Sequence, residues 1–149
     1  MGRLAVCVVA VACVGCAART PRVTVGALDG GLDGFVAAHP RPPRAIRVDE
    51  VARTAEASYH LVQAGKSESP HRHATHDLTV LVLRGRGRLV LGDRSIPMAA
   101  GDAALIPRNV VHWFSPVGGD AAALAIFTPA LEAPDVVPAG DVDSERDAR

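Results

Sequence analysis

Three histidines cluster in the middle of the sequence, at His71, His73 and His76. They directly precede residues 79–83, an apolar and partly β-branched run that is typical of a β-strand. Side chains two positions apart in a strand face the same side, so we expect His71 and His73 to project together. Two imidazoles on one face form a chelating pair. The sequence therefore predicts a metal site that needs at least one further ligand.

A second stretch, residues 101–111, reads as a strand and a turn that deliver His112 toward the same interior. We expect His71, His73 and His112 to be the metal ligands. Sites that are rich in imidazole suit Zn, Fe, Mn, Ni or Cu better than Mg or Ca, and the pattern does not choose among them. A barrel without metal, in which these histidines only line a pocket, remains an alternative.

Short strands recur along the chain and are separated by turns that contain Gly, Pro, Asn or Asp. We predict strands over residues 45–51, 57–63, 79–83, 88–91, 95–98, 103–106, 110–115 and 121–128. The third and fourth of these flank a Gly-containing turn and are expected to form a hairpin. His60, in the second strand, is expected to face away from the interior. No useful stretch has a helical period, which favours an all-β barrel or sandwich and excludes Rossmann and helix-bundle folds.

The two histidine stretches resemble the two motifs of the cupin superfamily. The first motif is matched by Gly65, His71, His73 and Gly85, and the second by Gly101, Pro107 and His112. The resemblance implies a small jelly-roll β-barrel and a metal held by the motif histidines. It also implies pairing of two copies through sheet edges, as a homodimer.

The chain departs from the first motif at the position of the family's glutamate ligand, which Leu78 occupies here. Leucine cannot bind a metal, so the carboxylate must come from elsewhere. Asp77 and His76 are the nearby candidates for an additional ligand. Strict alternation places Asp77 on the opposite face from Leu78, and only a β-bulge would turn it inward.

The N-terminal segment, residues 1–16, has a basic start, an apolar run of eleven residues from Leu4 to Val14, and small residues after it. This pattern indicates a signal peptide, because a membrane-spanning helix needs roughly 20 apolar residues. Cys16 follows Gly15 as the modified cysteine does in bacterial lipoprotein signals, so we expect lipidation at Cys16. Cleavage near Ala18 and an uncleaved anchor are the alternatives.

The rest of the chain divides into a flexible linker over residues 17–44, the cupin barrel over residues 45–128 and a disordered acidic tail over residues 129–149. Basic and acidic residues number 16 each, so no strong field attracts nucleic acid. We expect an exported protein, anchored in the membrane by lipid and facing the periplasm or cell surface, or otherwise soluble in the periplasm or secreted.

Two functions fit this pattern equally well. One is a metal-dependent enzyme, of an oxygenase-like or isomerase-like kind, that acts on a small molecule. In that case the motifs offer His76 or Asp77 as a general base only when these residues are free of the metal. The other is a non-catalytic periplasmic lipoprotein that binds a metal or a small ligand. Neither motif names a substrate.

Overall fold

The computed structural model describes residues 23–28 and 31–139. The helical elements are η1 (Gly26–Leu28) and α1 (Leu32–Ala38). The strands are β1 (Ile46–Arg53), β2 (Ser58–Ala64), β3 (His71–His73), β4 (Asp77–Arg84), β5 (Arg86–Leu91), β6 (Arg94–Ala99), β7 (Ala103–Ile106), β8 (His112–Pro116), β9 (Ala121–Thr128) and β10 (Val136–Pro138). The predicted signal segment, including Cys16, lies outside the described residues.

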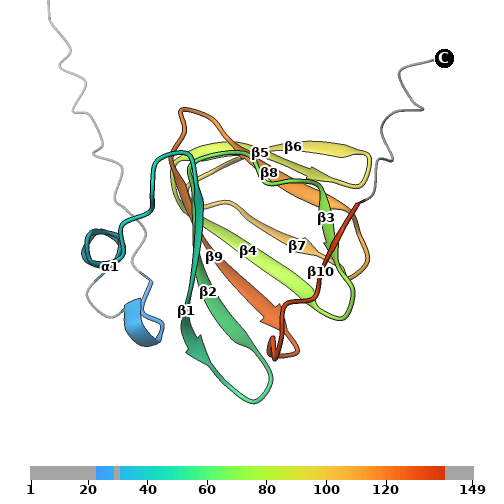
Figure 1. The fold of residues 1–149 in the computed structure, drawn as a ribbon, viewed down its shortest axis with the longest axis horizontal. Coiled ribbons are helices and arrows are strands. Elements are labelled where there is room, and N and C mark those ends of the chain that lie inside the picture. Colours follow the sequence, from blue (N-terminus) through green and yellow to red (C-terminus); the bar gives the residue numbers. More distant parts are fainter. Residues whose placement is uncertain (1–22, 29–30, 140–149) are drawn as a thin grey trace, which may run out of the picture.

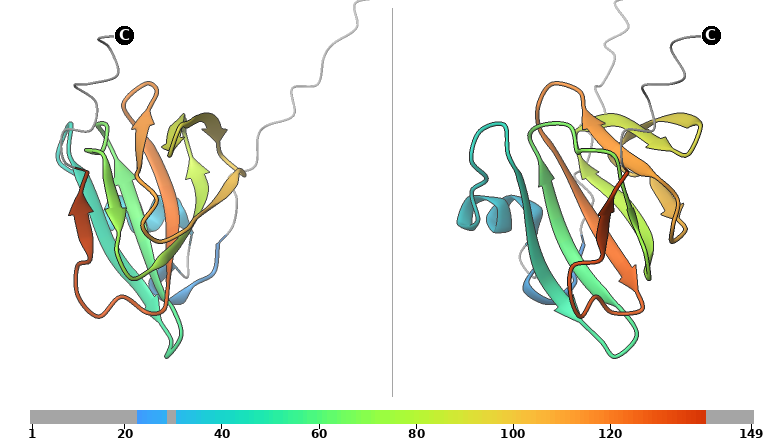
Figure 2. Two further views of the ribbon diagram at one scale, coloured as in Figure 1. Left: turned by 90° about the vertical axis from the view of Figure 1, so that its right-hand side faces the viewer. Right: turned by 45° about the vertical axis from the view of Figure 1, so that its right-hand side comes forward.

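The ten strands form two antiparallel sheets of five strands each, which face one another (Figures 1 and 2). One sheet has the order β1-β2-β9-β4-β7 and the other has the order β10-β3-β8-β5-β6. Apart from the consecutive pairs β1–β2 and β5–β6, neighbours in each sheet come from distant parts of the chain, as in a jelly roll. The prediction of a small all-β jelly-roll barrel is confirmed.

Alternation along the strands sends apolar side chains to two separate cores. In β9, Ala125 and Phe127 belong to the core between the two sheets, whereas Leu124 packs on the outer face of the first sheet. Leu61 of β2 is fully buried on that outer face. The first sheet therefore packs on both faces: its inner face borders the barrel interior, and its outer face contributes to a second core.

The outer core is completed by the segment that precedes β1. α1 lies beside β1 (Figure 1). Leu28, Leu32 and Phe35 of η1 and α1 are buried in this outer core with Val51 of β1 and Leu61 of β2. The expectation that residues 17–44 form a flexible linker is therefore wrong for this part. Its three large apolar side chains cover apolar surface that the sheet would otherwise expose to water.

The segment that follows β9 also differs from the prediction of a disordered tail. Residues 136–138 form β10 and pair with β3 at the edge of the second sheet. In the register, Val136 lies opposite His73 and Pro138 lies opposite His71. The described part of the tail, residues 129–139, is thus tied to the strand that carries two of the predicted ligands.

Gly85 marks the point where the chain passes from one sheet to the other. β4 pairs with β7 and β9, while β5 pairs with β6 and β8, so the predicted hairpin between them does not form. Gly85 has a φ of 76°, and a Cβ at this position would lie 2.3 Å from the carbonyl oxygen of Asp120. Both facts require glycine here.

No helix in the described part of the chain is long and apolar enough to cross a membrane.

Candidate metal centre

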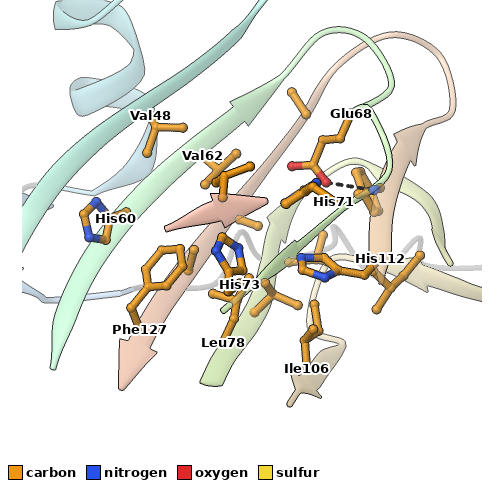
Figure 3. A pocket seen from close by; sticks show the side chains of 18 of the residues that line it. Val48, His60, Val62, Glu68, His71, His73, Leu78, Ile106, His112 and Phe127 are labelled. Atoms are coloured by element: carbon orange, nitrogen blue, oxygen red, sulfur yellow. Dashed lines mark hydrogen bonds between the residues drawn. The ribbon is translucent and has the colours of Figure 1, made fainter. Parts of the chain in front are cut away.

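The structure brings His71, His73 and His112 together inside the barrel (Figure 3). His71 and His73 flank Arg72 on β3, and His112 begins β8, directly opposite His71 in the register. One nitrogen of each imidazole lies within 4.8 Å of one nitrogen of the other two. We refer to these three residues as the histidine triad.

In each ring of the triad, Nδ1 is at hydrogen-bond distance from an oxygen atom. The Nδ1 atom of His71 lies 2.8 Å from the carbonyl oxygen of Ser69, and that of His112 lies 3.0 Å from the carbonyl oxygen of Val110. The Nδ1 atom of His73 lies 2.8 Å from a carboxylate oxygen of Asp135. Because these oxygens only accept, each Nδ1 carries the proton and donates. Each neutral ring thus keeps the lone pair of Nε2 for a metal.

Burial keeps two of these imidazoles neutral. It lowers the pKa of His112 to about 4, with a smaller contribution from the neighbouring His71 and His73. Burial also lowers the pKa of His73, against the opposing effect of Asp135. Uncharged imidazoles with free lone pairs are the form that binds transition metals. The donor set therefore fits a divalent transition metal.

Asp135, in the segment before β10, contacts the candidate site and was missed by the sequence interpretation. Its carboxylate accepts hydrogen bonds from Nδ1 of His73, from Nδ1 of His76 at 2.5 Å, and from the backbone N–H and hydroxyl of Thr75. Burial works to raise the pKa of Asp135, but these hydrogen bonds outweigh it and hold the pKa well below its usual range. The carboxylate thus fixes the orientation of His73 from outside the triad.

The two candidates for an additional ligand are not brought to the triad. His76 is buried and directs Nδ1 to Asp135. Asp77 forms a two-pronged ion pair with Arg108, whose side-chain hydrogen bonds lower the pKa of Asp77 to about 2. The pairing of β4 with β9 is regular at Asp77, so the bulge that would turn this carboxylate inward is absent there. Leu78 faces the interior, as strict alternation predicts.

The triad opens onto a cavity of about 400 Å³ between the two sheets (Figure 3). Apolar side chains provide most of its wall, including Val62, Leu78, Val80, Ile106, Phe114 and Phe127. The volume is in the range of pockets that hold small organic molecules. The polar residues that line the cavity are Glu68, Asp135, His60 and the histidine triad.

Glu68 places a carboxyl group in the cavity near His71 (Figure 3). One of its oxygens accepts a hydrogen bond of 2.8 Å from the backbone N–H of Phe114. Burial raises the pKa of Glu68, while the bond from Phe114 opposes this rise. The sequence did not predict that Glu68 lines the cavity, because Glu68 lies in a polar segment with Ser and Pro that is typical of an exposed loop. His60 also lines the cavity, contrary to the expectation that it faces away.

Comparisons with known proteins agree with this architecture. Residues 58–128 match the family model described as Cupin domain. An uncharacterized protein of Aquifex aeolicus (strain VF5) is 39% identical over 92 residues, which are 62% of this chain and 76% of that protein.

Solved structures with the same fold include KdgF from Halomonas sp., with 25% identity, a TM-score of 0.55, and coverage of 60% of this chain and 83% of that one. TT1209 from Thermus thermophilus has 21% identity, a TM-score of 0.57, and coverage of 64% and 95%. Pac13, described as a nucleoside dehydratase, has 19% identity, a TM-score of 0.55, and coverage of 66% and 81%.

Proposed function

The chain belongs to the cupin superfamily, and from this premise we propose that it is a metal-dependent enzyme for a small molecule. In this proposal His71, His73 and His112 hold a divalent transition metal, one of Zn, Fe, Mn, Ni or Cu. The substrate occupies the cavity beside them. The reaction is a proton transfer of the isomerase-like kind, in which Glu68 holds or accepts the proton.

The observation that carries the proposal is the juxtaposition of the triad with Glu68 in one apolar cavity. A metal bound by three neutral imidazoles keeps its full positive charge, which favours a ligand with an electron-rich oxygen. Such a metal supplies Lewis acidity to the oxygen that it binds. The fixed Nδ1 contacts of the triad prepare the Nε2 atoms for this task.

Glu68 supports a proton-transfer role because only one of its carboxyl oxygens has a hydrogen-bond partner among the described residues. The bond from Phe114 fixes the carboxyl group and leaves the other oxygen for the contents of the cavity. The cavity wall beside this group is largely apolar, and burial there raises the pKa of Glu68, which favours a carboxyl group that can hold a proton. A positioned carboxylate of this kind contributes roughly 100- to 10,000-fold to a proton-transfer rate.

The test is deuterium exchange at the carbon next to the carbonyl of small ketones and hydroxyketones, with the zinc-loaded full chain. We expect Glu68→Gln to lower the exchange rate about 100-fold or more while the bound zinc is unchanged. Glu56→Gln, at an exposed glutamate, is the matched control and should leave the rate unchanged. Exchange that is equal in the parent and in Glu68→Gln would exclude Glu68 as the base. Dioxygen consumption with diols, thiols or phenols would instead favour the oxygenase-like alternative.

A second candidate function is non-catalytic binding of a metal or small ligand. The observation that favours it is Leu78, which faces the interior at the position where the cupin motif has its carboxylate ligand. Without that carboxylate the site offers three candidate protein ligands among the described residues. Stoichiometric metal without turnover of any carbonyl compound, diol, thiol or phenol would favour this candidate.

Export and membrane attachment are further proposals, which rest on the sequence pattern of residues 1–16. We expect palmitate labelling in a bacterial host to be lost in Cys16→Ser and retained in Cys13→Ser. Labelling that survives Cys16→Ser would exclude this cysteine as the modified residue. Pairing of two copies into a homodimer is likewise a proposal, and sedimentation of the purified chain tests it.

A further inference from the structure

His60 lies in the cavity on the far side of Phe127 from the histidine triad (Figure 3). The ring centroid of Phe127 is 5.2 Å from that of His60 and 4.9 Å from that of His73, with edge-on contacts to both. Within the cavity, the ring of Phe127 therefore lies between His60 and His73 of the triad.

The hydrogen bonds of Ser58 define the tautomer of His60. The Ser58 hydroxyl oxygen accepts the backbone N–H of Leu131 at 3.0 Å and lies 2.9 Å from Nε2 of His60. The hydroxyl hydrogen needs an acceptor, and Nε2 is the acceptor that the structure places beside it. The nearest carboxylate oxygen, of Glu50, lies 4.0 Å from Nε2 and is beyond hydrogen-bond distance. We therefore assign Nε2 as the acceptor of the Ser58 hydroxyl, which places the proton of the neutral ring on Nδ1. Burial lowers the pKa of His60, with the nearby Glu50 opposing it, and so favours this neutral form.

The Nδ1–H group has no partner in the described part of the chain. It is also not sealed inside the protein. Among the described residues, Arg41 Nε is the only buried side-chain nitrogen or oxygen that lacks a hydrogen-bond partner. The Nδ1 atom of His60 therefore remains accessible, and the ring that carries it lines the cavity. An accessible donor on a nearly buried ring is suited to a ligand.

We propose that His60 is a second recognition point of the cavity and donates a hydrogen bond from Nδ1 to an acceptor atom of the ligand. The ligand class is then a small molecule with an electron-rich oxygen at one end for the triad, an apolar middle, and a carbonyl or similar acceptor at the other end. The apolar middle lies against Val62, Leu78 and Phe127. This inference extends the proposed function. It rests on that function for the ligand end that binds at the triad, and on His60 for the other end.

The first test compares binding of oxo acids and plain acids to the zinc-loaded full chain by calorimetry. The series runs from 4-oxopentanoate to 7-oxooctanoate, each paired with the saturated acid of the same length. The carboxylate serves the triad end, and the ketone serves His60. At one chain length we expect the oxo acid to bind about three- to tenfold more tightly, which is the value of one hydrogen bond.

The His60→Leu variant should abolish this preference and leave the bound zinc unchanged. His39→Leu, which replaces a histidine that does not line the cavity, is the matched control and should retain the preference. An equal affinity for both acids at every chain length would overturn the proposal. A preference that persists in His60→Leu would overturn it as well.

The second test needs neither metal nor a variant. Long-range ¹H–¹⁵N correlation spectra of the zinc-free chain report which ring nitrogen of His60 carries the proton. We expect the Nδ1–H tautomer, and we expect its resonance to shift when 2-heptanone is added. A proton on Nε2, or an unchanged resonance at saturating ketone, would refute the inference. If zinc does not bind, the acids lose their contact at the triad and the proposed function fails, whereas this spectrum still reports on His60.

Discussion

Replacing Asp135 with Asn should weaken zinc binding without removing any ligand. Asn has one carbonyl oxygen and one amide group, whereas the carboxylate accepts bonds from His73, His76 and Thr75 on two oxygens. Turned either way, the amide presents N–H groups to at least one donor, which then loses its partner. A buried donor without a partner costs about 1–3 kcal/mol. This value agrees with the roughly 10- to 100-fold loss of metal affinity that such outer partners typically cause.

The affinity of the full chain for zinc is best measured by competition with a chromogenic chelator, with urea unfolding of the zinc-free protein in parallel. The unfolding curve separates a loss of fold from a loss of metal binding. Asp93→Asn, at an exposed turn aspartate, is the matched control and should change neither quantity. An unchanged zinc affinity in a folded Asp135→Asn protein would refute the idea that this carboxylate orients His73.

Three further predictions concern stability and pH. Phe35→Ala should lower the free energy of unfolding by about 3–5 kcal/mol in urea titrations, because α1 packs on the sheet; no change would mean that this segment is a free linker. The pKa of His112 is about 4 in the folded chain, below the ordinary value of 6.5. As the pH falls, His112 therefore takes up a proton in the unfolded chain before it does so in the folded chain. The zinc-free protein should lose stability as the pH falls from 6.5 to 4. His112→Gln should flatten that decline in urea titrations across this range, and an equally steep decline would contradict the assignment. The pKa of Asp77 is lowered to about 2, so its pair with Arg108 should stabilise the fold above pH 4 and lose this effect as the pH falls to 2. The difference in unfolding free energy between the parent and Asp77→Asn should shrink over that interval, and a constant difference would argue against the ion pair.

The pair of His71 and His73 could be predicted from the sequence because its geometry is local, whereas His112 was indicated by the second motif and is placed opposite His71 by the long-range pairing of β8 with β3. The spacing of His71 and His73 places both on one face of a strand, whatever that strand pairs with. The same alternation correctly turned Leu78 inward and Asp77 outward, which left the carboxylate position of the motif without a ligand.

The residues around the triad could not be predicted because long-range pairing places them. Asp135 reaches His73 from 62 positions away, through a segment whose Pro and acidic composition resembles a disordered tail. Glu68 and His60 each read as ordinary solvated or outward-facing residues. Phe35 looked like part of a Gly- and Pro-rich linker, since its partner surface exists only after β2 and β9 have paired.

The most direct test of the metal centre is the zinc content and zinc coordination of the purified full chain, by elemental analysis and X-ray absorption. We expect one zinc per chain with three imidazole nitrogens in the first coordination sphere. The variants His71→Ala and His112→Ala should each lose stoichiometric metal, while His39→Ala should retain it. A parent chain without stoichiometric metal in zinc-containing buffer, or variants of the triad that keep the metal of the parent, would contradict the proposed metal centre.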